Sequence, residues 1–135
     1  MTEPVWVWLA KREVLAIHDR QLAEHGGATG LLDSGLLASA LARPQQLFAY
    51  GNPDVFELAA AYTAGVVCNR PFVDGNKRTG LVIGILFLEL HGFLFTAPEV
   101  EATQAVLSLA ASEMTEDTFI TWLRDNSVLT EMRRP

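Results

Sequence analysis

A polar turn at residues 68–80 constrains the fold of this 135-residue chain more than any other feature. The turn contains a glycine followed closely by two cations, Lys77 and Arg78, and it lies between two strongly apolar segments, residues 58–68 and 81–90. A turn of this kind that opens a buried helix collects backbone N–H groups, the positive end of the helix dipole and positive side chains at one point. The sequence therefore predicts two buried helices joined by a phosphate-binding turn.

Composition limits the class of protein. Apolar residues make up 50% of the chain and charged residues 19%, which predicts one folded domain over residues 1–135 rather than a disordered chain. The net charge of −6 argues against a protein that coats nucleic acid. A single cysteine, Cys68, excludes an internal disulfide and fits a reducing cytoplasm. The first nine residues lack the pattern of a signal peptide, and the longest apolar run, residues 81–88, is too short to cross a bilayer. We therefore expect a cytoplasmic protein without a membrane segment.

Apolar spacing and capping residues predict an all-α bundle around a buried central helix, residues 76–91, with little or no sheet. Gly80 and Gly84 in that helix would let a neighbouring helix approach closely. Pro44 is expected to end the second helix near Arg43, which leaves residues 45–53 irregular. The other helices are expected over residues 11–25, 34–41, 54–69, 96–112 and from 115 onward, with a frayed tail at 131–135. Asp54 with Glu57, and Thr96 with Glu99, have the pattern of a capping box, and Thr115 is expected to cap the last helix.

Residues 70–80 read Arg-Pro-Phe-Val-Asp-Gly-Asn-Lys-Arg-Thr-Gly. This string resembles the signature of the Fic/Doc superfamily, His-Pro-Phe-x-Asp/Glu-Gly-Asn-Gly/Lys-Arg. Residues 9–27, 30–37, 40–45 and 86–92 are similar to the death-on-curing (Doc) branch, so the likeness spans nearly the whole chain. The resemblance implies a Fic/Doc-like helical domain that acts as the toxin of a type II toxin–antitoxin system.

The resemblance also implies a role for each motif position. Backbone N–H groups of the turn would bind the phosphates of ATP or another nucleoside triphosphate, and Lys77 and Arg78 would neutralise phosphate charge. Asp74 would hold Mg²⁺, a cation that prefers carboxylate and phosphate oxygens. Phe72 would only anchor the turn in the core. The implied catalytic, phosphate-binding and metal residues are Asp74, Gly75, Asn76, Lys77, Arg78 and Thr79.

Two positions favour one branch of the superfamily over the other. Fic adenylyltransferases have glycine where this chain has Lys77, and a second arginine where it has Leu81. The Doc branch has the lysine, binds the nucleotide in the reverse direction and transfers the γ-phosphate. The resemblance therefore implies a kinase that phosphorylates a threonine of elongation factor Tu and blocks translation. It also implies an antitoxin partner whose Phd-like C-terminal segment folds as a helix into a groove of the toxin.

Arg70 departs from the family pattern. It replaces the histidine that takes the proton from the attacking hydroxyl, and arginine stays protonated and has no acceptor. Loss of a general base costs a factor on the order of 10²–10⁴ in rate. We therefore expect a chain that binds nucleotide and catalyses poorly or not at all. An adenylyltransferase and an inactive module that binds nucleotide or protein remain the alternatives.

Other residues invite functional interpretations, each with a plainer one beside it. His18 and His25 share a helix face and could suggest metal ligands, but no cysteine or carboxylate cluster joins them, so ordinary hydrogen-bonded histidines are favoured. His91, expected at a helix C-terminus and partly charged there, lies about four turns from the phosphate end of the central helix. Cys68 is expected in the core. Residues 45–53 are either the flap that positions a target segment, as in the family, or an ordinary loop.

Overall fold

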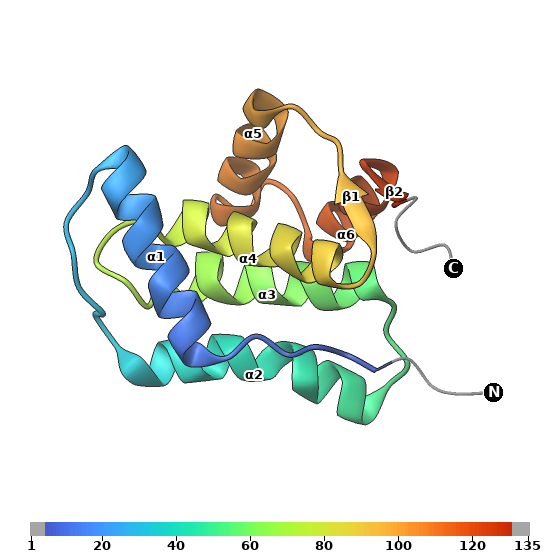
Figure 1. The fold of residues 1–135 in the computed structure, drawn as a ribbon, viewed down its shortest axis with the longest axis horizontal. Helices are drawn as coiled ribbons and strands as arrows, with labels where there is room; N and C mark the ends of the chain where they lie inside the picture. The colour runs from blue at the N-terminus through green and yellow to red at the C-terminus, as the bar shows by residue number, and fades with distance from the viewer. Residues whose placement is uncertain (1–4, 131–135) are drawn as a thin grey trace.

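The computed structural model describes residues 5–130, so the tail expected at 131–135 lies outside the described residues. Within this range the chain forms six α-helices and one small antiparallel sheet of two strands, which confirms the all-α prediction (Figure 1). None of these helices is long and apolar enough to cross a membrane. The elements are α1 (Lys11–His25), α2 (Ser34–Tyr50), α3 (Val55–Asn69), α4 (Asn76–Leu90), β1 (Phe93–Phe95), α5 (Glu99–Ala110), α6 (Glu116–Asp125) and β2 (Ser127–Leu129).

Helices α3 and α4 lie side by side in the middle of the molecule, with α2 below them and α5 and α6 above them (Figure 1). Their contact depends on the two glycines of α4. A Cβ at Gly80 would come within 2.8 Å of Val67 Cγ2, and a Cβ at Gly84 would lie 3.1 Å from the carbonyl oxygen of Ala59. The predicted close approach is therefore present. Of the two helices, α3 is buried more completely than α4.

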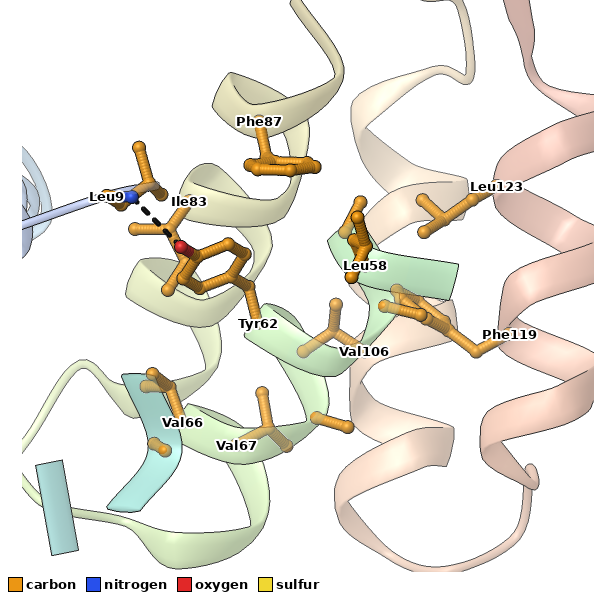
Figure 2. Packing of buried hydrophobic residues seen from close by; sticks show 14 of the residues in the cluster. Leu9, Leu58, Tyr62, Val66, Val67, Ile83, Phe87, Val106, Phe119 and Leu123 are labelled. Atoms are coloured by element: carbon orange, nitrogen blue, oxygen red, sulfur yellow. Dashed lines mark hydrogen bonds between the residues drawn. The ribbon is translucent and has the colours of Figure 1, made fainter. Parts of the chain in front are cut away.

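The core fills the spaces between these helices with aliphatic and aromatic side chains (Figure 2). Tyr62 of α3 is fully buried, and its hydroxyl oxygen accepts the N–H of Leu9 at 2.9 Å. Burial raises the pKa of this hydroxyl above its ordinary value, so the group stays neutral. On the other side of α3, Phe119 and Leu123 of α6 pack toward Leu58 (Figure 2).

Two helix starts follow from local capping as predicted. The Asp54 side chain accepts the N–H of Glu57 at 2.9 Å, and the Glu57 side chain accepts the N–H of Asp54 at 3.2 Å. Thr115 caps α6 by accepting the N–H of Thr118. The expectation for Thr96 was wrong, because its N–H and its hydroxyl both donate to the carbonyl oxygen of Asn126, and α5 begins without a side-chain cap.

The predicted end of the second helix was also wrong, since α2 continues through Pro44 to Tyr50. Pro44 cannot donate to the carbonyl of Ala40, four residues earlier. That carbonyl instead packs against α3, where a Cβ at Gly65 would lie 3.0 Å from it. Arg43 then ties α2 to both neighbours, since it donates to the carbonyl of Ala61 and pairs with Glu116 at 2.9 Å. Tertiary contacts therefore outweigh the local penalty of the proline.

The N-terminal segment, residues 5–9, is neither helix nor strand, and it packs against α4 through Trp6 and Trp8, whose rings stack on Phe87. The N–H of Val7 donates to Nε2 of His91 at 2.9 Å, so this nitrogen must carry a lone pair. Nδ1 of the same ring then donates to the carbonyl of Phe87 at 2.7 Å. His91 is therefore neutral here, contrary to the partly charged ring expected from its place at a helix C-terminus.

The α3–α4 contact gives a stability prediction. Gly84→Ala should lower the free energy of unfolding by about 1–3 kcal/mol through overpacking, because the new methyl meets the Ala59 carbonyl and the hydroxyl of Thr63. That hydroxyl already donates to the carbonyl of Gly80 at 2.7 Å and cannot swing aside without loss. The helix preference of alanine, up to about 1 kcal/mol, works in the opposite direction.

Urea unfolding followed by circular dichroism measures this difference. Gln104→Ala, on the exposed face of α5, is the control and should stay within about 0.5 kcal/mol of the parent chain. A Gly84→Ala protein as stable as that control would show that α3 and α4 tolerate a wider separation.

Candidate phosphate-binding site

The site is the turn between α3 and α4. Helix α3 ends at Asn69, and Arg70 caps it in a left-handed conformation with φ 52° and ψ 56°. The N–H of Arg70 donates to the carbonyl of Val66 at 3.0 Å, which fixes its backbone at the end of the helix. Gly75, with φ 80°, then turns the chain into α4. A side chain is strained at this φ, which accounts for glycine.

The side chain of Asn76 closes the turn. Its Nδ2 donates to the carbonyl of Phe72 at 2.9 Å, and its Oδ1 accepts the N–H of Phe72 at 3.0 Å. The residue is 8% exposed, so both bonds are shielded from water. The group of Asn76 expected to bind phosphate is its backbone N–H, and the side chain is used inside the turn.

Two rings support the turn from below. Phe72 is buried, as expected for an anchor, and stacks on His18 of α1 with ring centroids 3.7 Å apart. Nε2 of His18 lies 2.8 Å from the carbonyl oxygen of Asp74, and because a carbonyl only accepts, this nitrogen is the donor. His18 is therefore a buried support of the turn, which agrees with the plainer interpretation of this histidine. Within residues 5–130, no group of three or more histidine, cysteine or acidic side chains could hold a metal ion.

The loop between α1 and α2, residues 26–33, braces the other side of the turn. The N–H of Leu32 donates to the carbonyl of Pro71 at 2.7 Å, and the N–H of Val73 donates to the carbonyl of Gly30 at 3.1 Å. The N–H of Ala28 donates to Oδ2 of Asp74 at 2.9 Å. No local pattern in the sequence predicts this loop as part of the site, because it pairs with residues about forty positions away.

The backbone amides at the start of α4 are available to a ligand. Gly75 provides no side-chain cap, and the first backbone amide of this helix with a protein acceptor is that of Thr79, which donates to Gly75 at 3.0 Å. In the described part of the chain, no protein oxygen accepts the N–H of Asn76, Lys77 or Arg78. Three unpaired amides and the positive end of the helix dipole therefore point away from the helix, an arrangement that suits an anion.

Two pockets open on this turn and share residues 74–77 and Leu107 of α5. One, the Arg78 pocket, has a volume of about 380 Å³. Besides the shared residues, it is lined by His25, Arg78, Leu81, Glu99, Thr103 and Val106. The other, the Arg70 pocket, has a volume of about 310 Å³. It is lined further by Val67, Arg70, Val73, Ala110 and Ala111. In both pockets, α5 forms the wall opposite the turn.

Asp74 has the properties of a magnesium ligand in this setting. Its side chain is exposed and borders both pockets, and one of its two oxygens is occupied by the N–H of Ala28. Mg²⁺ is commonly bound by one or two carboxylates together with substrate phosphates. The donor set therefore fits a Mg²⁺ ion that arrives with a nucleotide, and not a metal site made by the protein alone.

The structure brings most of the predicted site residues together, with one exception. Asp74, Gly75, Asn76, Lys77 and Arg78 line the pockets, but Thr79 is fully buried and its hydroxyl has no partner. Three polar pocket residues outside the motif, His25, Glu99 and Thr103, were not assigned to this site from the sequence, because no local pattern links them to the turn.

Two further expectations near the site were wrong. Cys68 is exposed and not in the core. Residues 45–50 belong to α2, and the segment 51–54 precedes α3, whereas Arg70 follows it. The full length of α3, roughly 22 Å, therefore separates that segment from the turn (Figure 1). Residues 45–50 are thus helical, and residues 51–53 form an ordinary short loop that lies away from this site.

Comparison with known proteins agrees with the motif. A model described as "Fic/DOC family" matches residues 8–88, which extend from the start of α1 through most of α4. Over 94 residues the chain is 34% identical to "Protein kinase doc" of Escherichia phage P1. The aligned region covers 68% of this chain and 75% of that protein. Over 75 residues this chain is 39% identical to "Toxin Doc" of Mycolicibacterium smegmatis. That aligned region covers 53% of this chain and 57% of the mycobacterial protein. This chain belongs to the Fic/DOC family.

Proposed function

We propose that this chain is a Doc-type toxin whose turn binds a magnesium–nucleoside triphosphate and presents its γ-phosphate to a hydroxyl of a protein target. The observation that carries the proposal is the group of unpaired amides at residues 76–78, which opens into two pockets beside Lys77 and Arg78. A relative named as a protein kinase, 34% identical, supports a phosphotransferase activity.

The side chains divide the work of holding the nucleotide. The N–H groups of residues 76–78 would donate hydrogen bonds to phosphate oxygens, and the planar guanidinium of Arg78 could bind two oxygens at once. Lys77 would add a point charge where both pockets meet. Asp74 would hold Mg²⁺, and the bound ion would neutralise phosphate charge and orient the phosphates of the nucleotide for attack by the hydroxyl. His18 and Asn76 would keep these groups in place through their bonds to the turn.

Two residues of the site indicate which group of the nucleotide is transferred. Lys77 stands where adenylyltransferases of the family have glycine, and its long side chain in the shared part of the pockets would hinder their nucleotide pose. Leu81 lines the Arg78 pocket where those enzymes have a second arginine. Transfer of the γ-phosphate is therefore favoured over transfer of AMP.

The acceptor hydroxyl would enter through the Arg70 pocket, since position 70 holds the general base in the family. Arg70 cannot take up the proton that this hydroxyl must lose, because its guanidinium has no acceptor and stays charged. The transferred proton would have to go to water or to the phosphate itself. We therefore propose that this form is a slow or inactive enzyme that still binds nucleotide.

The target and the partner follow from the same family relationship. We propose a threonine of elongation factor Tu as the acceptor, with arrested translation as the result. We also propose an antitoxin with a Phd-like C-terminal segment that folds on the toxin and neutralises it. A second candidate function, an inactive module that sequesters nucleotide or translation factor, is favoured by Arg70 alone.

Restoration of the base tests the proposal. Arg70→His should raise phosphate transfer to elongation factor Tu by about 10²–10⁴-fold, because an imidazole can accept the proton. The reaction is run with ATP and Mg²⁺ in two parallel samples, one labelled at the γ-phosphate and one at the α-phosphate. We expect label on the target from the γ-position only.

The controls separate the alternatives. Label from the α-position would identify an adenylyltransferase. A stable complex with unmodified target in both forms, without transfer after Arg70→His, would favour the binding module. Equal activity of the two forms would show that a base at position 70 is not needed.

The metal role of Asp74 gives a second prediction. Asp74→Asn keeps an oxygen that can accept the N–H of Ala28, so the loop should stay in place while the negative charge is lost. Chelation of Mg²⁺ should weaken ATP binding to the parent chain by about tenfold or more, since a contact with a charged group is worth roughly 1.5–3 kcal/mol. Calorimetric titration with and without EDTA measures this. An Asp74→Asn protein with the same dependence on Mg²⁺ as the parent would exclude Asp74 as the ligand.

A further inference from the structure

Arg70 lines a pocket that has few negative charges to oppose its guanidinium. Four ion pairs occur among residues 5–130, and none of them includes Arg70, Lys77 or Arg78. The Arg70 side chain is exposed and lines the Arg70 pocket together with Lys77. Asp74 is the only carboxylate in the lining of that pocket. With Mg²⁺ on Asp74, as the proposed function requires, the pocket would be strongly positive.

The backbone holds Arg70 in this position. It is one of two residues other than glycine with positive φ in the described range, and its N–H is tied to Val66 at the end of α3. The next residue, Pro71, has its carbonyl paired with the amides of Leu32 and Asp33. The Cα of Arg70 is therefore fixed from both sides, and only its side chain is free to turn within the pocket.

The other walls of the Arg70 pocket are largely apolar. Val67 and Val73 lie on the side of the turn, and Leu107, Ala110 and Ala111 lie on the side of α5. An apolar wall lowers the local dielectric and strengthens the attraction between a cation and an anion. This pocket is suited to a compact anion and offers little to a large apolar group.

We propose that the Arg70 pocket is a subsite for the terminal phosphate of a nucleoside triphosphate, with the guanidinium of Arg70 as its ligand. The proposal rests on the proposed function, because the preceding phosphates occupy the amides of residues 76–78. The two pockets share residues 74–77, so a phosphate chain that lies on this turn reaches both of them. The nucleoside end then occupies the Arg78 pocket.

This arrangement has a consequence for ligand choice. A nucleoside triphosphate reaches Arg70, whereas a monophosphate held in the Arg78 pocket does not. The chain therefore binds ATP more tightly than ADP, and ADP more tightly than AMP. Arg70 accounts for the difference between ATP and ADP. The same cation occupies the entrance that the acceptor hydroxyl needs, so it holds the triphosphate without transfer.

Nucleotide titrations of the full chain in the presence of Mg²⁺ test the subsite. Arg70→Gln keeps most of the side-chain length and removes the charge. It should weaken ATP binding by about tenfold to a hundredfold, the usual worth of a charge-assisted contact, and leave AMP binding within about twofold. Arg70→Lys, which keeps the charge and loses the planar fork, should lie between the parent and Arg70→Gln.

Two further variants guard against indirect effects. Arg70→Asn suits the left-handed backbone, and it should reproduce the loss seen with Arg70→Gln if that loss comes from the guanidinium and not from a disturbed turn. Arg12→Gln removes an exposed arginine that lines neither pocket, and it should leave both affinities unchanged. Melting temperatures show whether each variant is folded.

The outcomes separate this subsite from the proposed function. ATP binding that is unchanged in Arg70→Gln, or ATP and AMP binding that fall equally, would overturn the subsite and leave nucleotide binding intact. A parent chain that binds no nucleotide, beside an Arg70→His variant that binds and transfers phosphate, would overturn the subsite and nucleotide binding by the Arg70 form, and would support the proposed kinase activity of the scaffold. Absence of both binding and transfer in every form would overturn both.

Discussion

The site depends on the pair of hydrogen bonds between the Asn76 side chain and the backbone of Phe72. This pair closes the turn on itself, so the backbone amides that follow are left without a partner and point outward. A carboxamide is well suited to this task, because it offers one donor and one acceptor in a plane and carries no charge that would compete with a phosphate. An aspartate at position 76 would lose the donor to the Phe72 carbonyl and place a negative charge at the binding surface. The neutral, buried amide is therefore what keeps the turn both closed and attractive to anions.

The rest of the fold keeps this turn at a fixed place relative to α5. The glycines of α4 let it lie against α3, and the turn that joins the two helices is correspondingly tight. Helix α1 supplies His18 beneath the turn, and the loop after α1 pairs with its outer edge. Since α5 packs on both α3 and α4, its side chains meet the turn across the two pockets. The position of the pockets is thus set by helix packing, and their chemistry by the turn.

The sequence predicted what is encoded locally. The motif, the capping box at Asp54, the cap at Thr115 and the small residues at Gly80 and Gly84 each act through neighbours in the chain or through one close contact. Contacts between distant segments could not be predicted from the sequence. The stack of His18 on Phe72, the pairing of the 26–33 loop with the turn and the placement of His25 beside Arg78 join residues about forty to sixty positions apart. No periodicity reports such pairs.

The errors have the same origin. The rule that proline ends a helix is a local rule, and α2 overrides it because Arg43 and Ala40 make contacts on α3 and α6 that only the continuous helix provides. Thr96 has the composition of a cap, but the carbonyl of Asn126 is a nearer partner once β1 and β2 have paired. Cys68 lies on the face of α3 that is turned from the core, although the residues before it are buried on nearly every side.

In the proposed function, the amides that would bind phosphate and the position that would hold the base are separate parts of this scaffold. The binding groups are backbone amides and cations from Gly75 onward, and their geometry is set by Asn76 and His18, neither of which touches position 70. The residue at position 70 sits on a backbone that α3 and the 26–33 loop hold in place, so its side chain can change without disturbing the turn. An acceptor at this position would take up the proton of the attacking hydroxyl, whereas the guanidinium of Arg70 would lack the base and, in the proposed subsite, bind the terminal phosphate. A substitution at position 70 would therefore change both the base and the ligand of the terminal phosphate, while the amides of residues 76–78 stay in place.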